Sequence, residues 1–316
     1  MSEGFKFKMA KWMPFQDQEA CERVRAVKRD DFAKSPSPHL KIRILRDDEF
    51  PFRMIMDQFG RIKEAAEQGQ RLVLILPQPD PLYAWLAFLC NKFCVSCKNL
   101  YTFNMDEYAD MDGSIAPETW PNSFLYNMKL NFYGKLLPEL RPPESQIQGP
   151  TNENFPAYGK MIADLGGADV VYGGIGWSGH VAYIEPGSEA FAPCLMDEWV
   201  KIGPRIVELT PFSILQNCLG PEFGQSGDWS SVPPKGATIG PAEYLGAKLR
   251  SSWNGYRVGN SMVSWQRFTV RLASHGPITP LVPSTMLQMA PSELYLSETL
   301  AADITPQSVE NFSWYA

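Results

Sequence analysis

Residues 168–188 read A-D-V-V-Y-G-G-I-G-W-S-G-H-V-A-Y-I-E-P-G-S, and this stretch decides both the fold and the position of a candidate site. The run 168–172 is short and apolar, which predicts a buried strand. The glycines that follow let the backbone turn sharply and come close to a ligand. Because open α/β sheets bind ligands at the carboxyl ends of their strands, we predict an active-site loop that carries His180 and Glu185, five residues apart.

Similar apolar runs recur along the chain, with helical stretches between them. The further predicted strands are residues 72–76, 99–105, 205–209, 237–240 and 293–296. A helix is expected from about Ser123 to Leu137. No internal repeat is visible, and the alternation of strands with helices predicts an α/β fold. We expect a doubly wound, mostly parallel sheet with helices on both faces.

The first 45 residues have mixed charge and no clean period, so we expect residues 1–45 to form an N-terminal extension packed on the domain. Residues 46–316 are then expected to form a single α/β domain. The chain has 316 residues, of which 44% are hydrophobic and 20% charged, enough to bury a large core.

Composition also restricts the partners of the protein. A formal net charge of −6 argues against a nucleic-acid or anionic-membrane surface, because such a surface needs clustered positive charge. No apolar stretch reaches the roughly 18 to 20 residues that span a bilayer, and the first residues lack the apolar core of a signal peptide. We therefore expect a cytoplasmic protein that acts on a small molecule. A homo-oligomer is left open.

Three cysteines, Cys90, Cys94 and Cys97, have a C-x3-C-x2-C spacing that could hold an iron–sulfur cluster. The stretch 81–89 leads into them with a helical apolar pattern, so the favoured interpretation is that at least two of the thiols pack in the core. The other three cysteines are scattered, and neither a zinc site nor a disulfide framework is indicated. We expect no metal.

Four segments resemble, in order and approximate spacing, motifs of the glucosamine-6-phosphate deaminase/isomerase family, whose relatives include 6-phosphogluconolactonases. They are T-F-N-M-D-E-Y at 102–108, W-P-N-S-F at 120–124, the loop at 173–188, and the segment from H-G-P-I-T-P at 275–280 to Gln288. The resemblance covers about residues 70 to 300. It implies a Rossmann-like fold of the sugar-phosphate deaminase/isomerase type, and the E-P-G-S ending of the loop favours the deaminase branch over the lactonases.

The resemblance also implies a chemistry. Interconverting an aldose and a ketose requires opening the sugar ring and moving a proton between adjacent carbons, so the site needs groups that give and take protons. Asp106 would be the base that transfers the proton between C1 and C2. His180 would assist ring opening, and Glu185 would hold its imidazole in a useful orientation and tautomer. No cofactor is implied.

Each of these residues also has a structural interpretation. Asp106 could cap the next helix or pair with a basic side chain. His180 could be a structural histidine, and the role of Glu185 depends on it. Glu107 and Tyr108 could stabilise their loop, although Glu107 is also a candidate for substrate binding. The full set of substrate-binding candidates is Gln78, Glu107, Gly174, Gly176, Ser178 and Arg267.

The chain departs from the family pattern beside the loop histidine and at positions that would hold a phosphate. Ser178 stands where the pattern has an aspartate two residues before the histidine. The loop 76–81 reads L-P-Q-P-D-P in place of approximately L-P-T-G-G-T-P, so prolines remove amides that would cradle a phosphate, and Asp80 would repel it. Arg267 is the one plausible phosphate contact that survives. Each lost charge-assisted bond is worth roughly 1.5–3 kcal/mol.

Three hypotheses therefore stay open. The chain is a sugar isomerase or deaminase of the same proton-transfer type whose sugar is unphosphorylated or has its anion held elsewhere. Alternatively, it is a lactone hydrolase like the 6-phosphogluconolactonases. The third hypothesis is a catalytically silent sugar-binding or regulatory protein on the same fold.

Overall fold

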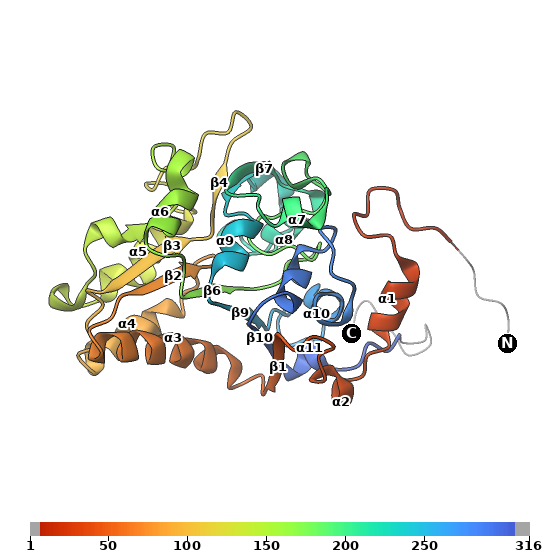
Figure 1. The fold of residues 1–316 in the computed structure, drawn as a ribbon, viewed down its shortest axis with the longest axis horizontal. Coiled ribbons are helices and arrows are strands. Elements are labelled where there is room, and N and C mark those ends of the chain that lie inside the picture. The colour runs from red at the N-terminus through yellow and green to blue at the C-terminus, as the bar shows by residue number, and fades with distance from the viewer. Residues whose placement is uncertain (1–6, 307–316) are drawn as a thin grey trace.

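The computed structural model describes residues 7–306 and contains a parallel sheet of seven strands (Figure 1). In spatial order the strands are β1 (Leu40–Leu45), β10 (Ser292–Ser297), β9 (Leu249–Asn254), β6 (Val170–Gly173), β2 (Leu72–Leu76), β3 (Leu100–Asn104) and β5 (Ile147–Gln148). Every neighbouring pair in this sheet is parallel. The predicted α/β fold with a mostly parallel sheet is confirmed.

Strand β2 shows why both faces of the sheet are covered. Alternate side chains of a strand point to opposite faces, and all five residues of L-V-L-I-L are buried. Leu72, Leu74 and Leu76 belong to a core cluster that also holds residues of α3 (Phe50–Glu67), α4 (Tyr83–Lys92) and α5 (Phe124–Asn131).

The two remaining residues of β2, Val73 and Ile75, belong to the core on the opposite face. That core also contains residues of α6 (Tyr158–Asp164) and α10 (Gln266–His275). An uninterrupted apolar run is thus what a central parallel strand requires.

A second, antiparallel sheet has three strands in the order β4 (Asp106–Ala109), β8 (Lys235–Thr238) and β7 (Arg205–Glu208). The runs predicted at 205–209 and 237–240 overlap β7 and β8, which lie in this smaller sheet. Only Met105 separates β3 from β4, so the chain passes from the large sheet to the small one at Asp106. The first carboxylate of the D-E-Y motif therefore sits at the junction of the two sheets.

The N-terminal segment contributes more to the fold than an extension would. Its last six residues, predicted to lie outside the domain, form β1 and pair with β10 at the edge of the sheet. Leu40 and Ile42 are buried while Lys41 is exposed, as expected for an edge strand. Strand β1 is thus part of the large sheet, and the division into an extension and a single domain stays a prediction. The preceding helices are α1 (Gln18–Arg25), which packs on α10, and α2 (Arg29–Phe32).

The remaining helices are short: α7 (Met196–Trp199), α8 (Pro211–Asn217), α9 (Pro241–Gly246) and α11 (Glu298–Ala301). The helix predicted over 123–137 is shorter than expected, because α5 ends at Asn131 and a 3-10 turn follows at Tyr133–Lys135. Within residues 7–306 no helix has the length and apolarity to cross a membrane.

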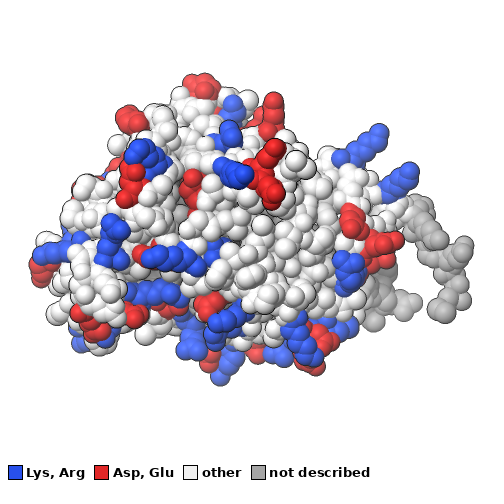
Figure 2. Space-filling view, viewed as in Figure 1, with Lys and Arg blue, Asp and Glu red and all other residues white. Residues whose placement is uncertain are grey.

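Two of the three clustered cysteines, Cys90 and Cys97, are fully buried, while Cys94 is exposed. The prediction that at least two of these thiols pack in the core is confirmed. In the part of the chain that the structure describes, no group of three or more His, Cys, Asp or Glu side chains is placed to hold a metal ion. On the face drawn in Figure 2, basic and acidic side chains are interspersed, without a large patch of one sign.

Candidate active site

A pocket of about 160 Å³ lies where β2, β3 and β6 end, beside the junction of the two sheets. Three successive strand-to-loop segments line it, which is where open α/β sheets bind ligands. The predicted site residues that line it are Gln78, Asp106, Gly174, Gly176 and His180. The remaining lining residues are Pro77, Met105, Phe124, Ile175, Ala182, Tyr183, Gln216, Asn217, Trp265 and Gln266.

Asp106 is the first residue of β4, and its side chain is 5% exposed. Burial raises the pKa of its carboxyl well above the ordinary value, and the negative charge of Glu107 adds to this effect. None of the ion pairs formed among residues 7–306 involves Asp106. The carboxyl therefore lines the pocket as an unpaired group with a high affinity for a proton.

Glu107, the next residue, faces the opposite direction, as strand geometry requires. Its carboxylate accepts hydrogen bonds from the backbone amides of Tyr108 (3.0 Å), Phe124 (3.0 Å) and Leu125 (3.1 Å). It also accepts one from the hydroxyl of Ser123 (2.8 Å). Glu107 thus caps the start of α5 and does not reach the pocket, which corrects its expected role in substrate binding.

His180 is 4% exposed and packs against the glycines of its own loop. A β-carbon on residue 176 would lie 1.9 Å from His180 Nε2, so only glycine leaves room for the imidazole there. Gly179 has a φ of 82°, a conformation that favours glycine. Burial lowers the pKa of His180, an effect that the charge of Glu185 opposes. At neutral pH the imidazole is therefore uncharged.

The other imidazole nitrogen, Nδ1, is held by two hydroxyl groups. Ser178 Oγ lies 2.8 Å from it and Ser213 Oγ 3.2 Å from it. Ser213 in turn donates to Glu185 Oε1, and Thr210 donates to Glu185 Oε2 at 2.9 Å. Glu185 itself lies 3.8 Å from Nδ1. The carboxylate therefore orients His180 mainly through Ser213, a residue of α8 that has no distinguishing signal in the sequence.

This chain of contacts favours one tautomer of the imidazole. A serine has a single O–H, and Ser213 directs it to the carboxylate of Glu185. A hydrogen bond between Ser213 and Nδ1 then requires a proton on Nδ1, and the hydroxyl of Ser178 can accept from the same N–H. In that tautomer Nε2 carries the free lone pair, as a general base requires.

Arg267 is not brought to the pocket. Its guanidinium donates to the backbone carbonyls of Ala302 (3.0 Å) and Asp303 (2.6 Å), which follow the end of α11. Basic side chains stabilise the free carbonyls at a helix C-terminus in this way. The expected phosphate contact is thus corrected: Arg267 fastens α10 to the end of α11.

The preceding residue, Gln266, lines the pocket and was not predicted. Its side-chain amide donates to the carbonyl of Ile175 (3.0 Å) and to Asn254 Oδ1 (3.2 Å). Asn254 Oδ1 also accepts from the amide of Ile175 at 2.8 Å. Together these residues fix the backbone of the glycine loop from two sides.

Two further pocket residues from α8 also escaped prediction. Gln216 accepts a hydrogen bond from the backbone amide of Trp177 at 2.8 Å, and Asn217 donates to the hydroxyl of Tyr183 at 3.0 Å. With Ser213, they show that α8 forms one wall of the site.

Comparison with known proteins identifies the family. No family model matches the chain. It is 30% identical over 230 residues to the glucosamine-6-phosphate deaminase of Phocaeicola vulgatus, covering 71% of this chain and 76% of that protein. It is 31% identical over 207 residues to that of Caenorhabditis elegans, covering 63% and 68%. The chain belongs to the glucosamine-6-phosphate deaminase family.

Solved structures agree with this assignment at the level of the fold. A monomeric glucosamine-6-phosphate deaminase superposes with a TM-score of 0.64 at 21% identity, covering 83% of this chain and 98% of that chain. A 6-phosphogluconolactonase from Trypanosoma cruzi gives a TM-score of 0.56 at 16% identity, covering 86% and 99%.

In this member of the glucosamine-6-phosphate deaminase family, two polar side chains of the loop 76–81 are engaged in hydrogen bonds. Asp80 accepts a hydrogen bond from the backbone amide of Leu82 at 2.8 Å, just before α4 begins. A carboxylate therefore stands at the helix start, where an anion would otherwise bind. Gln78 donates to Glu222 Oε1 at 2.6 Å.

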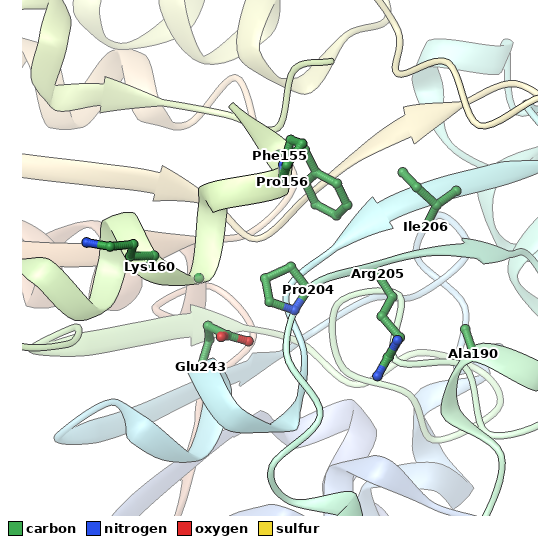
Figure 3. Close-up of a pocket in the computed structure, with 9 residues that line it drawn as sticks. Phe155, Pro156, Lys160, Ala190, Pro204, Arg205, Ile206 and Glu243 are labelled. Carbon is green, nitrogen blue, oxygen red and sulfur yellow. The ribbon is translucent and has the colours of Figure 1, made fainter. Parts of the chain in front are cut away.

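A larger cavity of about 600 Å³ lies apart from the predicted site residues (Figure 3). Phe155 and Lys160 line one side of it, Arg205 another, and Glu243 of α9 a third. Lys160 pairs with Asp164 at 2.6 Å, and Glu243 accepts from the amide of Gly240 at 2.9 Å. None of the predicted site residues of this family member lines the cavity.

Proposed function

We propose that the protein is a sugar isomerase or deaminase of the glucosamine-6-phosphate deaminase type, working by acid–base proton transfer. The observation that carries this proposal is that a buried, unpaired carboxyl and a buried neutral imidazole line one small pocket. The membership of the chain in the glucosamine-6-phosphate deaminase family supports it.

In the first step, His180 Nε2 takes the proton of the C1 hydroxyl while the bond between C1 and the ring oxygen breaks. The imidazolium then returns a proton to the ring oxygen, and the sugar opens to its aldehyde. The hydrogen bonds of Ser213 support this role, because they favour a proton on Nδ1 and a free lone pair on Nε2.

In the second step, the carboxylate of Asp106 removes the proton from C2 and returns it to C1. For an aldose this gives the ketose, with one hydroxyl proton moving from O2 to O1. For a 2-amino sugar it gives an imine at C2, which adds water and releases ammonia. A carboxyl group whose pKa is raised by burial is a stronger base once ionised, which suits the abstraction of a carbon-bound proton.

The substrate proposed is a neutral sugar or amino sugar, without a phosphate held by the loop 76–81. Asp80 accepts from the backbone amide of Leu82 just before α4, and Arg267 is engaged with backbone carbonyls. The proposed steps are ring opening, proton transfer and, for an amino sugar, addition of water with release of ammonia, and none of them requires a cofactor. Cytoplasmic location and homo-oligomeric assembly stay predictions.

The test is isotope exchange at C2. The protein is incubated in deuterated water with glucosamine, glucose, mannose, fructose and their 6-phosphates, and proton NMR follows deuterium at C2 of the aldoses and at C1 of fructose. Exchange is expected with at least one unphosphorylated sugar, and Asp106→Asn should abolish it. Asp110→Asn, the same change at an exposed position after β4, is the matched control and should leave exchange intact.

Two outcomes would overturn the proposal. Exchange that persists in Asp106→Asn would remove Asp106 from the reaction. A sugar that binds by saturation-transfer NMR, with no exchange for any member of the panel, would favour the silent sugar-binding hypothesis.

A further inference from the structure

A second cavity, of about 510 Å³, adjoins the candidate active site on the side of the N-terminal segment. Residues of the segment 7–25 cover it, including α1. Its floor contains Trp177 and Ser178 of the glycine loop, Phe212 of α8, and Trp265 at the start of α10. Trp265 lines this cavity and the 160 Å³ pocket alike.

The floor is a connected set of aromatic rings. Trp177 and Trp265 are stacked, with ring centroids 5.9 Å apart and an interplanar angle of 18°. Trp265 also stacks on Tyr256 at 3.7 Å, and Phe212 contacts Trp177 at 6.3 Å. These contacts fix the rings in place, so an apolar ligand that packs against the aromatic lining does not have to order it.

The polar groups of the cavity restrict the charge of an occupant. Its charged lining residues are Glu22 and Arg25, which have opposite signs and lie on one helix, so the lining favours neither a cation nor an anion. A volume of 510 Å³ falls in the range of about 300–1,000 Å³ that is typical of small-molecule sites.

We propose that this cavity binds a small, uncharged aromatic molecule. The site is separate from the sugar pocket, and its existence does not depend on the proposed function.

An occupant would also influence the candidate active site. Ser178 lines the cavity, and its hydroxyl lies 2.8 Å from His180 Nδ1. A molecule that contacts Ser178 changes the hydrogen bonding of that hydroxyl, and with it the proton affinity of the imidazole. Occupancy of the cavity therefore shifts the pKa of His180.

The binding test uses N-phenyl-1-naphthylamine, an uncharged aromatic probe whose fluorescence rises in apolar surroundings. We expect one saturable site per chain, with energy transfer from tryptophan, because Trp177 and Trp265 lie in its wall. Gln18→Trp fills the cavity from α1 and should weaken binding by at least about tenfold, which is about 1.4 kcal/mol. Glu19→Trp, the same change at the adjacent exposed position outside the lining, should bind as the wild type does.

Probe binding that does not saturate would overturn the proposed site. Equal affinity of the probe for Gln18→Trp and for the wild type would do the same. The coupling is tested by proton NMR titration of His180, assigned among the three histidines of the chain with a His180→Gln variant. Saturating probe should shift the His180 titration, and in Ser178→Ala the shift should disappear while probe binding persists. An unchanged titration in the wild type would overturn the coupling alone.

Discussion

Asp106→Asn should make the protein more stable at neutral pH while removing its activity. The carboxyl is 5% exposed, and burial and the charge of Glu107 raise its pKa well above the ordinary value. An ionised Asp106 is therefore unfavourable in the folded state, and a neutral asparagine of nearly the same size relieves that cost.

The sign and size follow from proton linkage. In the unfolded chain an aspartate titrates near pH 3.9, whereas in the folded state Asp106 keeps its proton to a higher pH. Between these two pKa values the folded state binds one more proton than the unfolded state. The free energy of unfolding therefore falls by about 1.4 kcal/mol for each unit that the pH rises through this window. Below the unfolded pKa the stabilising contribution is fully present, and above the folded pKa it is lost.

The assay is urea unfolding of both proteins from about pH 4 to about pH 8, with the free energy taken by linear extrapolation. The advantage of Asp106→Asn should grow with pH and then level off. Asp112→Asn is a control of opposite sign, because hydrogen bonds from Ser114 lower the pKa of the exposed Asp112. Parallel curves for Asp106→Asn and wild type, or a less stable variant at neutral pH, would refute the reasoning.

Three further substitutions test other parts of the site. Glu107→Gln replaces one acceptor oxygen by an NH₂ group among four hydrogen-bond donors, and should cost about 3 kcal/mol of unfolding free energy in urea; unchanged stability would contradict the capping role. Gly176→Ala places a methyl group 1.9 Å from His180 Nε2, so C2 exchange should be lost while the circular dichroism spectrum persists; full exchange activity would show that His180 can move without harm. Ser178→Asp puts a carboxylate beside Nδ1 and should raise the pKa of His180 in an NMR titration; a pKa that stays the same or falls would argue against this contact.

The parts of the fold that could be predicted from sequence are those whose signal is local. The run 72–76 is apolar at every position because both faces of β2 are buried, and it was recognised for that reason. The glycine loop was recognised because His180 needs glycine at 176 and 179 for space and for backbone conformation. Each of these requirements restricts the types of neighbouring residues, so it can be recognised in a short stretch of sequence.

Strand β9 was not predicted because its buried polar side chains find their hydrogen-bond partners in distant parts of the chain. Its sequence, L-R-S-S-W-N, has no apolar run, yet Arg250 is only 1% exposed. The guanidinium donates to the backbone carbonyls of Ala247 at 2.8 Å and Pro291 at 2.7 Å, which removes the usual cost of burying a charge without partners. No local sequence pattern predicts a buried arginine whose hydrogen bonds are made to backbone carbonyls.

The same limit applies to the site. Arg267 was expected at the pocket and Gln266 was not, although they are neighbours on α10. Successive residues of a helix differ in direction by about a quarter of a revolution. An approximate match to the family pattern therefore cannot tell which of two neighbours faces a ligand. Ser213 contacts Glu185 from 28 residues away in the sequence. Its role becomes visible only when α8 is placed against the glycine loop.

The departures from the family pattern are physically related, because each removes charge from the site or prevents an anion from binding there. Ser178 places a neutral hydroxyl beside Nδ1 where the pattern has a carboxylate, and burial keeps His180 uncharged at neutral pH. Asp80 occupies a helix start that would attract a phosphate, and Arg267 is engaged elsewhere. A site that kept a phosphosugar as substrate would be expected to keep at least one cation for it. The joint loss supports the proposed change of substrate to an uncharged sugar, because Asp106 and His180 still line the pocket and Glu185 still contacts His180 through Ser213.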